Sequence, residues 1–303
     1  MSDLRTAEAV AEFLGQLATE RRLSKHTVAA YRRDLQDLIQ FMLAEGIDDY
    51  RALDVHDIRR FAARLHRRGL SPRSIARRLS AVRSFLSQRM GVGAIPTNVA
   101  VHVQAPKPAR RLPKALDADQ VARLLERSED DDLTVRDRAV YELCYSSGLR
   151  LAELVGIDLG DLDFADRTVR VTGKGAKDRV IPVGSQAIEA VRDWLLVRRS
   201  IALPEEVALF VSRRGTRLAG RTIQTRLKRW AQAQGMPTHV HPHMLRHSFA
   251  SHLLESSGDL RAVQELLGHA SISTTQVYTH LDFQHLALTY DKAHPRARKR
   301  GSD

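Results

Sequence analysis

The proline-rich stretch VQAPKPARRLPKAL, residues 103–116, constrains most strongly how this chain can fold. Its three prolines lack a backbone donor, and its apolar residues follow neither a helical nor a strand period, so no regular element crosses it. Its four cations suit a linker that lets two basic domains close around a polyanion. The alternative is that the linker is a passive spacer. We therefore expect two domains, residues 1–93 and 115–303, joined by a basic linker over residues 94–114.

Helical periodicity fills the first domain. Apolar residues recur at helical spacing in four segments, and start and stop signals bound these segments. In the last of them, Ser71 and Pro72 have the preferences of an N-cap and a first helical residue, and Gly91 follows the final turn. We expect four helices in one compact unit, near residues 6–20, 24–46, 54–69 and 71–91.

The chain is strongly basic, with 48 Lys and Arg against 36 Asp and Glu and a net charge of +12. Such an excess favours a polyanionic partner, nucleic acid first and an anionic membrane surface second. Six arginines are expected on exposed faces of the first domain: Arg67, Arg68, Arg73, Arg77, Arg78 and Arg83. We assign the last four to contacts with DNA phosphates, the alternative being an ordinary solvated face. The sequence shows no membrane-spanning run and no signal peptide, which favours a cytoplasmic protein without a membrane partner.

The second domain combines helices with one hairpin. Helical patterns cover residues 117–128 and 137–148, and the helical period returns from about Gln186 and continues nearly to the end. Between them, residues 167–184 alternate apolar and polar side chains on both sides of the glycine-rich turn GKGAK, as a hairpin does. The predicted fold class is therefore mainly α with a small antiparallel β-sheet.

Seven polar residues of the second domain could share one site: Arg150, Glu153, Lys174, His243, Arg246, His269 and Tyr278. Arg150 and Glu153 are three positions apart, and so are His243 and Arg246. Each pair can therefore lie on one helical face. The lysine lies in the predicted hairpin turn. Gly268 can end a helix just before His269, and Ser273 can start the helix that carries Tyr278. The spacing leaves their convergence open, because these residues span more than a hundred positions.

The chemistry of this set is complete for attack on a phosphodiester. A tyrosine hydroxyl has a pKa near 10, so Tyr278 becomes a nucleophile only beside a base and within a cationic pocket. Two arginines, a lysine and two histidines supply donors for phosphate oxygens, an acid and a base. Each residue also has an ordinary alternative role. Arg150 and Glu153 could form a surface ion pair, and Lys174 could be a solvated turn lysine. His243 and Arg246 could cap and solvate a helix start, while His269 could be a loop histidine and Tyr278 a packing residue.

No motif for a metal or cofactor accompanies these residues. The chain lacks the GxxxxGKS/T phosphate loop, the HExxH zinc motif and any Cys-His ligand spacing. Four histidines cluster at His239, His241, His243 and His247, without an accompanying carboxylate pattern. The single cysteine, Cys144, excludes an internal disulfide and lies in an apolar helical context typical of a core thiol. We expect no cofactor and no metal.

Four stretches resemble the signature of the tyrosine recombinases, the phage integrase family, and follow one another in the family's order: SSGLRLAEL, GKGAKDRVIPV, HPHMLRHSFASHLL and LLGHASISTTQVYTHL. Together they cover the second domain, and the four-helix first domain resembles the family's SAM-like core-binding domain. The resemblance implies a DNA-binding domain at residues 1–93 and a catalytic domain at residues 115–303. It also implies a site-specific recombinase that needs neither ATP nor a metal ion for its chemistry.

The resemblance implies a reaction in two transesterification steps. Tyr278 would attack the scissile phosphate, which forms a 3′-phosphotyrosyl link and frees a 5′-hydroxyl. A 5′-hydroxyl from a partner strand would then attack that link and rejoin the DNA in a new arrangement. Lys174 would protonate the leaving 5′-oxygen, and His243 would assist the deprotonation of Tyr278.

The remaining positions of the motifs would hold the phosphate. By the resemblance, Arg150 and Arg246 contact the nonbridging oxygens, and His269 donates a hydrogen bond to the phosphate. Glu153 would orient Arg150.

Within the family, the C-terminal stretches are most similar to the bacterial recombinases that resolve chromosome dimers at cell division. This similarity implies double-stranded DNA with a specific chromosomal site, a sister recombinase in a heterotetramer and a cell-division DNA translocase as regulator. A helix near residues 283–293 would dock on a neighbouring subunit, or pack on its own domain. The alternatives are a different recombinase or integrase, a DNA-binding regulator that keeps only the fold, and a type IB topoisomerase.

Overall fold

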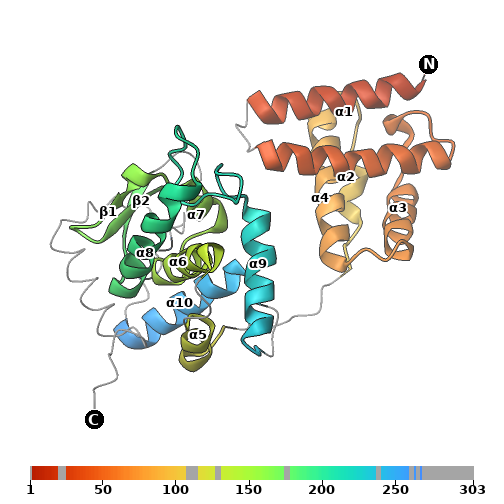
Figure 1. Ribbon diagram of the computed structural model, residues 1–303. Coiled ribbons are helices and arrows are strands. Elements are labelled where there is room, and N and C mark those ends of the chain that lie inside the picture. The colour runs from red at the N-terminus through yellow and green to blue at the C-terminus, as the bar shows by residue number, and fades with distance from the viewer. Residues whose placement is uncertain are drawn as a thin grey trace, which may run out of the picture. The chain divides into compact units, whose positions relative to one another are not determined.

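The computed structural model describes six stretches of the chain and two further residues: residues 2–19, 25–106, 115–126, 131–173, 178–236 and 240–258, with Val263 and Leu267. The chain forms two compact units, Met1–Arg111 and Leu112–Asp303 (Figure 1). Each unit has its own hydrophobic core. The predicted fold class, mainly helical with a small antiparallel sheet, is confirmed.

The described part of the first unit contains four α-helices and two short 3-10 helices: α1 (Ser2–Thr19), α2 (Lys25–Ala44), η1 (Tyr50–Ala52), α3 (Val55–Arg67), α4 (Pro72–Gly91) and η2 (Val99–His102). The four α-helices correspond to the four predicted from periodicity. Their apolar faces meet in a core where the rings of Phe13 and Tyr50 both pack edge to face on Phe85. This core holds α4 against α1 and α2.

Local signals set where α3 and α4 begin. Asp54 accepts from the Asp57 backbone N–H, and the Asp57 carboxylate accepts from the Asp54 backbone N–H in return. At the start of α4, Ser71 Oγ accepts from the Ser74 backbone N–H, and Pro72 occupies the first helical position, as predicted. The Ser71 cap and Pro72 thus fix the start of α4, the helix that carries the four arginines assigned to DNA.

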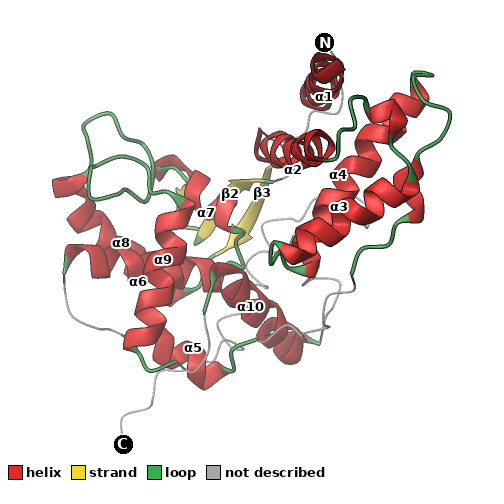
Figure 2. Cartoon of the chain, turned by 90° about the vertical axis from the view of Figure 1, so that its right-hand side faces the viewer, coloured by secondary structure: helices red, strands yellow, loops and turns green. Residues whose placement is uncertain are grey.

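The second unit combines a three-stranded sheet with helices (Figure 2). Its described elements are α5 (Ala118–Leu124), α6 (Asp132–Ser146), α7 (Leu151–Gly156), η3 (Leu159–Asp161), β1 (Leu162–Asp163), β2 (Thr168–Thr172), β3 (Asp178–Pro182), α8 (Ser185–Ile201), α9 (Gly220–Ala233) and α10 (Pro242–Ser257). The strands are antiparallel in the order β1-β2-β3, and Val169 of β2 lies opposite Leu162 on one side and Ile181 on the other. The predicted hairpin is β2 and β3, and β1 is an additional short strand at its edge.

Helix α6 lies in the core of the second unit. Its residues Tyr141, Cys144 and Tyr145 are buried, and the helix packs against α8, α9 and α10. Burial raises the pKa of the Cys144 thiol to about 12, so the thiol is protonated at neutral pH and is a poor nucleophile. The prediction of an inert core thiol is confirmed.

The prediction that helices continue from about Gln186 nearly to the end is wrong for residues 203–219. Helix α8 ends at Ile201, and α9 begins only at Gly220. The intervening segment forms two isolated antiparallel bridges, Asp158 with Ala208 and Val211 with Arg217. The segment is therefore a folded loop attached to the end of α7.

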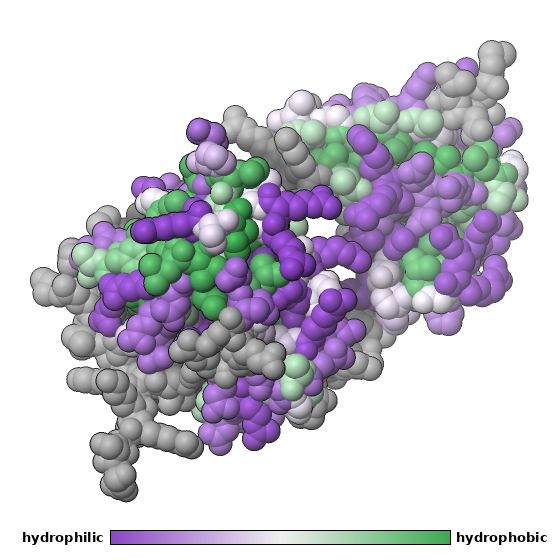
Figure 3. Space-filling view, viewed as in Figure 1, coloured by the Kyte–Doolittle hydropathy of each residue, from purple (hydrophilic) through white to green (hydrophobic). Residues whose placement is uncertain are grey.

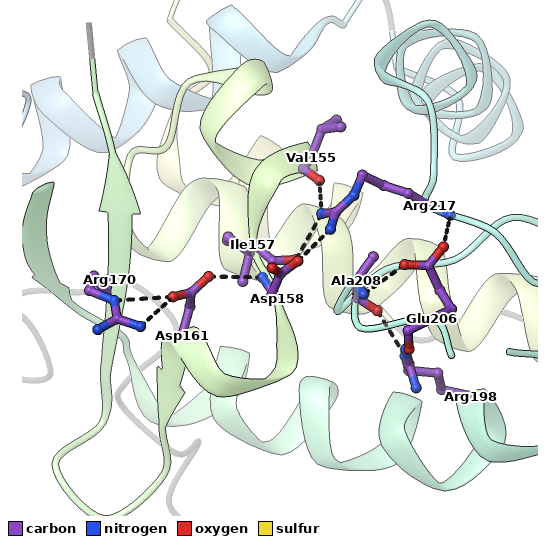
Figure 4. A network of polar contacts seen from close by, with 9 residues as sticks. All are labelled: Val155, Ile157, Asp158, Asp161, Arg170, Arg198, Glu206, Ala208 and Arg217. Atoms are coloured by element: carbon purple, nitrogen blue, oxygen red, sulfur yellow. Dashed lines mark hydrogen bonds and ion pairs between the residues drawn. The ribbon is translucent and has the colours of Figure 1, made fainter. Parts of the chain in front are cut away.

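Two features of the sequence explain this loop. Pro204 lacks the backbone donor that a continued helix needs, and Gly215 has φ +78°, with Ile201 O only 2.6 Å from where a Cβ would lie. Glu206 then holds the loop together, because its carboxylate accepts from the backbone N–H groups of Ala208 and Arg217 at 2.9 and 2.8 Å (Figure 4). Among the described residues, no helix is both long and apolar enough to cross a bilayer.

Candidate active site

The site begins at the N-terminus of α7, where Arg150 is the N-cap residue. The Arg150 backbone N–H donates to Glu153 Oε2 at 2.8 Å, and Arg150 Nη1 donates to Glu153 Oε1 at 2.9 Å. The predicted contact between these two residues is therefore present. It is not an exposed surface pair, because the Glu153 side chain is only 4% exposed while that of Arg150 is 42% exposed.

A third residue, Arg179 of β3, completes the contacts of this carboxylate. Arg179 Nη1 donates to Glu153 Oε1 at 2.9 Å and Nη2 donates to Oε2 at 3.0 Å, so the two planar groups form a bidentate pair. The Arg179 side chain is 19% exposed. Sequence reasoning did not select Arg179, although it lies within the GKGAKDRVIPV motif that carries Lys174.

Arg246 of α10 lies on the other side of the same carboxylate. Its Nη1 is 4.0 Å from Glu153 Oε2 and donates to Gly148 O at 2.5 Å, and its Nη2 donates to Leu267 O. Gly148 has φ +55°, and a Cβ there would lie 2.4 Å from the ring of Phe249. Only glycine fits at this point of the SSGLR motif, so the carbonyl that holds Arg246 depends on it.

The charges of this cluster do not balance, because one buried carboxylate faces three guanidinium groups. Burial alone would raise the pKa of Glu153, but hydrogen bonds from Arg179 and Arg150 hold it below its ordinary value, so the carboxylate is ionised. Burial, and then the charge of Arg150, lower the pKa of Arg246 to about 10, which still leaves it protonated at neutral pH. The surplus of positive charge suits an anion such as a phosphodiester.

His243 lies in the first turn of α10, three residues before Arg246. Pro242 occupies the first helical position, and His241 is the N-cap residue, whose Nδ1 accepts from the Met244 backbone N–H at 3.2 Å. The His243 side chain is exposed, and its ring centroid is 4.7 Å from that of His247. The structure therefore places an exposed imidazole one turn from a buried arginine.

The structure thus brings together Arg150, Glu153 and Arg246, and adds Arg179. Lys174, His269 and Tyr278 lie outside the described residues, as does the predicted docking helix at residues 283–293.

Two other features of the second unit bear on the site. Within the described residues, no group of three or more His, Cys, Asp or Glu side chains is arranged to hold a metal ion. A pocket of about 460 Å³ between α6 and α9, lined by Thr134, Asp137 and Arg226 among others, contains none of the predicted site residues.

Of the arginines assigned to DNA contact, two lie on the exposed surface of α4, Arg73 and Arg77. Hydrophilic side chains cover much of the visible surface of the first unit (Figure 3). Arg77 Nη1 is 2.9 Å from Asp34 Oδ2, and its side chain is 48% exposed. A partly exposed guanidinium anchored at one end can still present donors to a phosphate.

The other two arginines have contacts inside the unit. Arg78 is mostly buried and its Nε donates to Asp37 Oδ2 at 2.6 Å. Arg83 Nε donates to Ala100 O at 3.0 Å and Nη2 donates to Val103 O at 2.6 Å. The prediction that Arg78 and Arg83 lie on an exposed face is wrong, because Asp37 holds the guanidinium of Arg78 and carbonyl groups around η2 hold that of Arg83.

Comparison with known proteins identifies the family. Residues 114–285 match the phage integrase family, and residues 10–90 match its N-terminal SAM-like domain. A tyrosine recombinase XerC from Alcanivorax borkumensis is 53% identical over 301 residues, which is 98% of this chain and 97% of that protein. A tyrosine recombinase XerC from Azotobacter vinelandii is 55% identical over 292 residues, or 96% and 97% of the two chains. The chain belongs to the phage integrase family.

This tyrosine recombinase also shares its fold with two solved structures. A lambda integrase dimer bound to a COC′ core site matches with a TM-score of 0.69 at 18% identity, over 90% of this chain and 99% of that one. The XerH recombinase in a post-cleavage complex with a palindromic difH substrate matches with a TM-score of 0.68 at 22% identity, over 88% and 79%. The predicted family is confirmed, and the chain is a site-specific DNA recombinase.

Proposed function

We propose that this recombinase cuts and rejoins DNA through a 3′-phosphotyrosyl link to Tyr278, with the scissile phosphate held by Arg150 and Arg246. The observation that carries the proposal is the cluster around Glu153, in which a buried carboxylate accepts hydrogen bonds from the N-cap arginine of α7 and an arginine of β3 and lies 4.0 Å from the arginine of α10. Fixed donors of this kind stabilise developing charge without reorganising during the reaction.

The geometry of Arg246 supports its role at the phosphate. A guanidinium has five N–H donors, and the described contacts of Arg246 use two of them, on Gly148 O and Leu267 O. These two bonds fix the plane of the group while leaving donors for a nonbridging oxygen. Because the side chain is only 8% exposed, its attraction for that oxygen is weakly screened by water.

Arg150 would hold the second nonbridging oxygen. Its guanidinium is anchored to Glu153 through Nη1, while its side chain remains 42% exposed and so can reach a bound ligand. Glu153 would orient Arg150, as the family resemblance implied. Its two contacts with Arg150, one to the backbone and one to the side chain, support that role.

The remaining roles concern proton transfer. Tyr278 Oη would form the bond to phosphorus as the bond to the 5′-oxygen breaks, and His243 would accept the tyrosine proton. Lys174 would give a proton to the departing 5′-oxygen, since an alkoxide is a poor leaving group. His269 would donate a hydrogen bond to the phosphate. In the second step a 5′-hydroxyl attacks the phosphotyrosine, and Tyr278 leaves with a proton restored.

We propose double-stranded DNA with a specific chromosomal site as substrate. Residues 1–93 would bind it through Arg73 and Arg77, residues 94–114 would link the domains, and residues 115–303 would catalyse the reaction. We also propose that the protein resolves chromosome dimers, a role that its similarity to relatives named tyrosine recombinase XerC supports. The sister recombinase XerD in a heterotetramer, a cell-division DNA translocase as regulator and a cytoplasmic location belong to this proposal as implications of the family resemblance.

A nicked duplex tests the proposed chemistry. When the strand is nicked next to the scissile phosphate, the fragment that carries the free 5′-hydroxyl diffuses away after cleavage, and the covalent intermediate accumulates. Incubation with the protein, followed by a denaturing gel, should show DNA that migrates with protein. Specific DNA binding without any such adduct would instead indicate a DNA-binding regulator.

A further inference from the structure

We propose that Arg179 is a positioning residue of the active site, which holds Glu153 so that its carboxylate orders Arg150 for the phosphate beside Arg246. The inference rests on the function proposed above and adds a residue outside the set Arg150, Lys174, His243, Arg246, His269 and Tyr278.

The bidentate contact of Arg179 fixes the plane of the Glu153 carboxylate. The terminal torsion of a glutamate side chain is broad, so the plane of the carboxylate depends on its partners. Arg150 contacts both oxygens, but its guanidinium belongs to a side chain that is 42% exposed, so a second and more buried partner restricts the torsion further. Arg179 engages both oxygens at once, at 2.9 and 3.0 Å. With that plane fixed, Oε1 faces Arg150 Nη1 at 2.9 Å, while Oε2 faces the Arg150 backbone N–H at 2.8 Å and Arg246 Nη1 at 4.0 Å.

Burial makes this contact stronger than an ordinary surface pair. The Glu153 and Arg179 side chains are 4% and 19% exposed, so little water screens them. The same sheet offers a contrast, because Arg170 of β2 also contacts a carboxylate, that of Asp161, but its side chain is 59% exposed. Both arginines are on the hairpin, and only Arg179 contacts the site.

Arg179 also ties the hairpin to the start of α7. It lies opposite Val171 in the pairing of β2 with β3, on the strand that follows Lys174 in the sequence. Its bonds to Glu153 connect this strand to the helix whose N-cap is Arg150. The strand and the helix start are thereby held in one arrangement.

Lysine cannot replace arginine fully in this role. Its ammonium is a point charge that cannot make two parallel bonds to a carboxylate, whereas the planar guanidinium matches both oxygens. Arg179→Lys should therefore keep the charge but lose the fixed plane, and Arg179→Met should lose both.

The test compares the full-length protein with Arg179→Met, Arg179→Lys and the matched control Arg170→Met. Covalent adduct formation on the nicked duplex is measured in single turnover at saturating protein, and affinity for the same DNA is measured separately. We expect Arg179→Met to slow adduct formation by about tenfold to a hundredfold, the size of effect that a misplaced catalytic group produces, with DNA affinity within about twofold. Arg179→Lys should fall between wild type and Arg179→Met, and Arg170→Met should match wild type.

Melting temperatures of the same variants separate positioning from support of the fold. Arg179→Met loses two hydrogen bonds to a buried carboxylate, so a lower melting temperature is expected, and adduct formation is measured at temperatures where every variant is fully folded. The inference holds if folded Arg179→Met is still slow. It is overturned if Arg179→Met cleaves like wild type, if its defect lies entirely in DNA affinity, or if its rate returns to the wild-type value at a lower temperature. A wild-type protein that forms no adduct would refute the proposed function instead, so the two failures are distinguishable.

Discussion

Replacing Glu153 with glutamine should destabilise the second unit, although the two side chains have nearly the same shape. Four hydrogen bonds of 3.0 Å or less end on this carboxylate, two from Arg150 and two from Arg179. Glutamine offers one acceptor oxygen and turns an NH₂ group toward arginine donors, so about half of these bonds are lost. The three guanidinium groups then face one another without an anion.

The loss of unfolding free energy in Glu153→Gln can be estimated from the burial of Glu153 and its partners. Removing one partner from a buried ion pair costs about 3–5 kcal/mol. We expect the lower end, about 3 kcal/mol, because Arg150 is 42% exposed and its charge can return to water. An exposed carboxylate is the control: Asp193 is 3.8 Å from Arg138 and 55% exposed, so Asp193→Asn should cost less than about 1 kcal/mol.

The effect should depend on pH in a defined direction. Because the folded-state pKa of Glu153 lies below its ordinary value of 4.5, its ionised form stabilises the fold above that pH, and this contribution is lost as the pH falls through the folded-state pKa. The difference in unfolding free energy between wild type and Glu153→Gln should be constant near neutral pH and shrink below pH 4.5. Urea denaturation at several pH values measures it. A Glu153→Gln variant as stable as wild type at pH 7 would refute the reasoning, since the arginines would then not need the carboxylate.

Three further predictions concern DNA binding and the chemistry. Arg73→Met should weaken DNA binding and reduce the slope of log affinity against log salt by about one, and equal salt slopes for Arg73→Met and wild type would remove Arg73 from the interface. Arg83→Met should instead lower the melting temperature, because the carbonyl groups of Ala100 and Val103 each lose a donor. Adduct formation should persist in excess EDTA, and inhibition that magnesium alone reverses would show that the metal-free mechanism is wrong. Lys174→Ala should cleave ordinary DNA slowly but recover most of its rate on a 5′-bridging phosphorothiolate, because the thiolate leaves without a proton. Arg150→Ala should not recover on that substrate. An equal defect of Lys174→Ala on both substrates would mean that Lys174 positions DNA.

The helices could be predicted from the sequence because their signals are local. Ser71 and Pro72 mark the start of α4, and apolar spacing marks its buried face, so these local signals together placed it. The loop at residues 203–219 was missed although Pro204 and Gly215 interrupt the helical period, because its structure also depends on hydrogen bonds that Glu206 accepts from the backbone of Ala208 nearby and of Arg217, 11 residues away. Such contacts leave no periodic pattern.

Residue spacing alone could predict contacts only between site members that are close in sequence, and the family motifs supplied Arg246. Glu153 lies three residues after Arg150, and helical geometry brings them together. Arg179 is 26 residues further along on a strand, and nothing in its alternating pattern indicates a partner on α7. Arg83 was misassigned for a related reason: a long arginine side chain can begin near the surface and still place its guanidinium on buried carbonyl groups.

The central claim is that Tyr278 is the residue that becomes linked to DNA. The most direct measurement is mass spectrometry of the peptide that remains attached to DNA after proteolysis of the adduct, performed for wild type and Tyr278→Phe. Our account predicts a phosphotyrosyl link at Tyr278 in the wild type and no adduct from Tyr278→Phe, with its DNA affinity near normal because only a hydroxyl is lost. A link at another residue, such as Tyr290, or an undiminished adduct from Tyr278→Phe would contradict it.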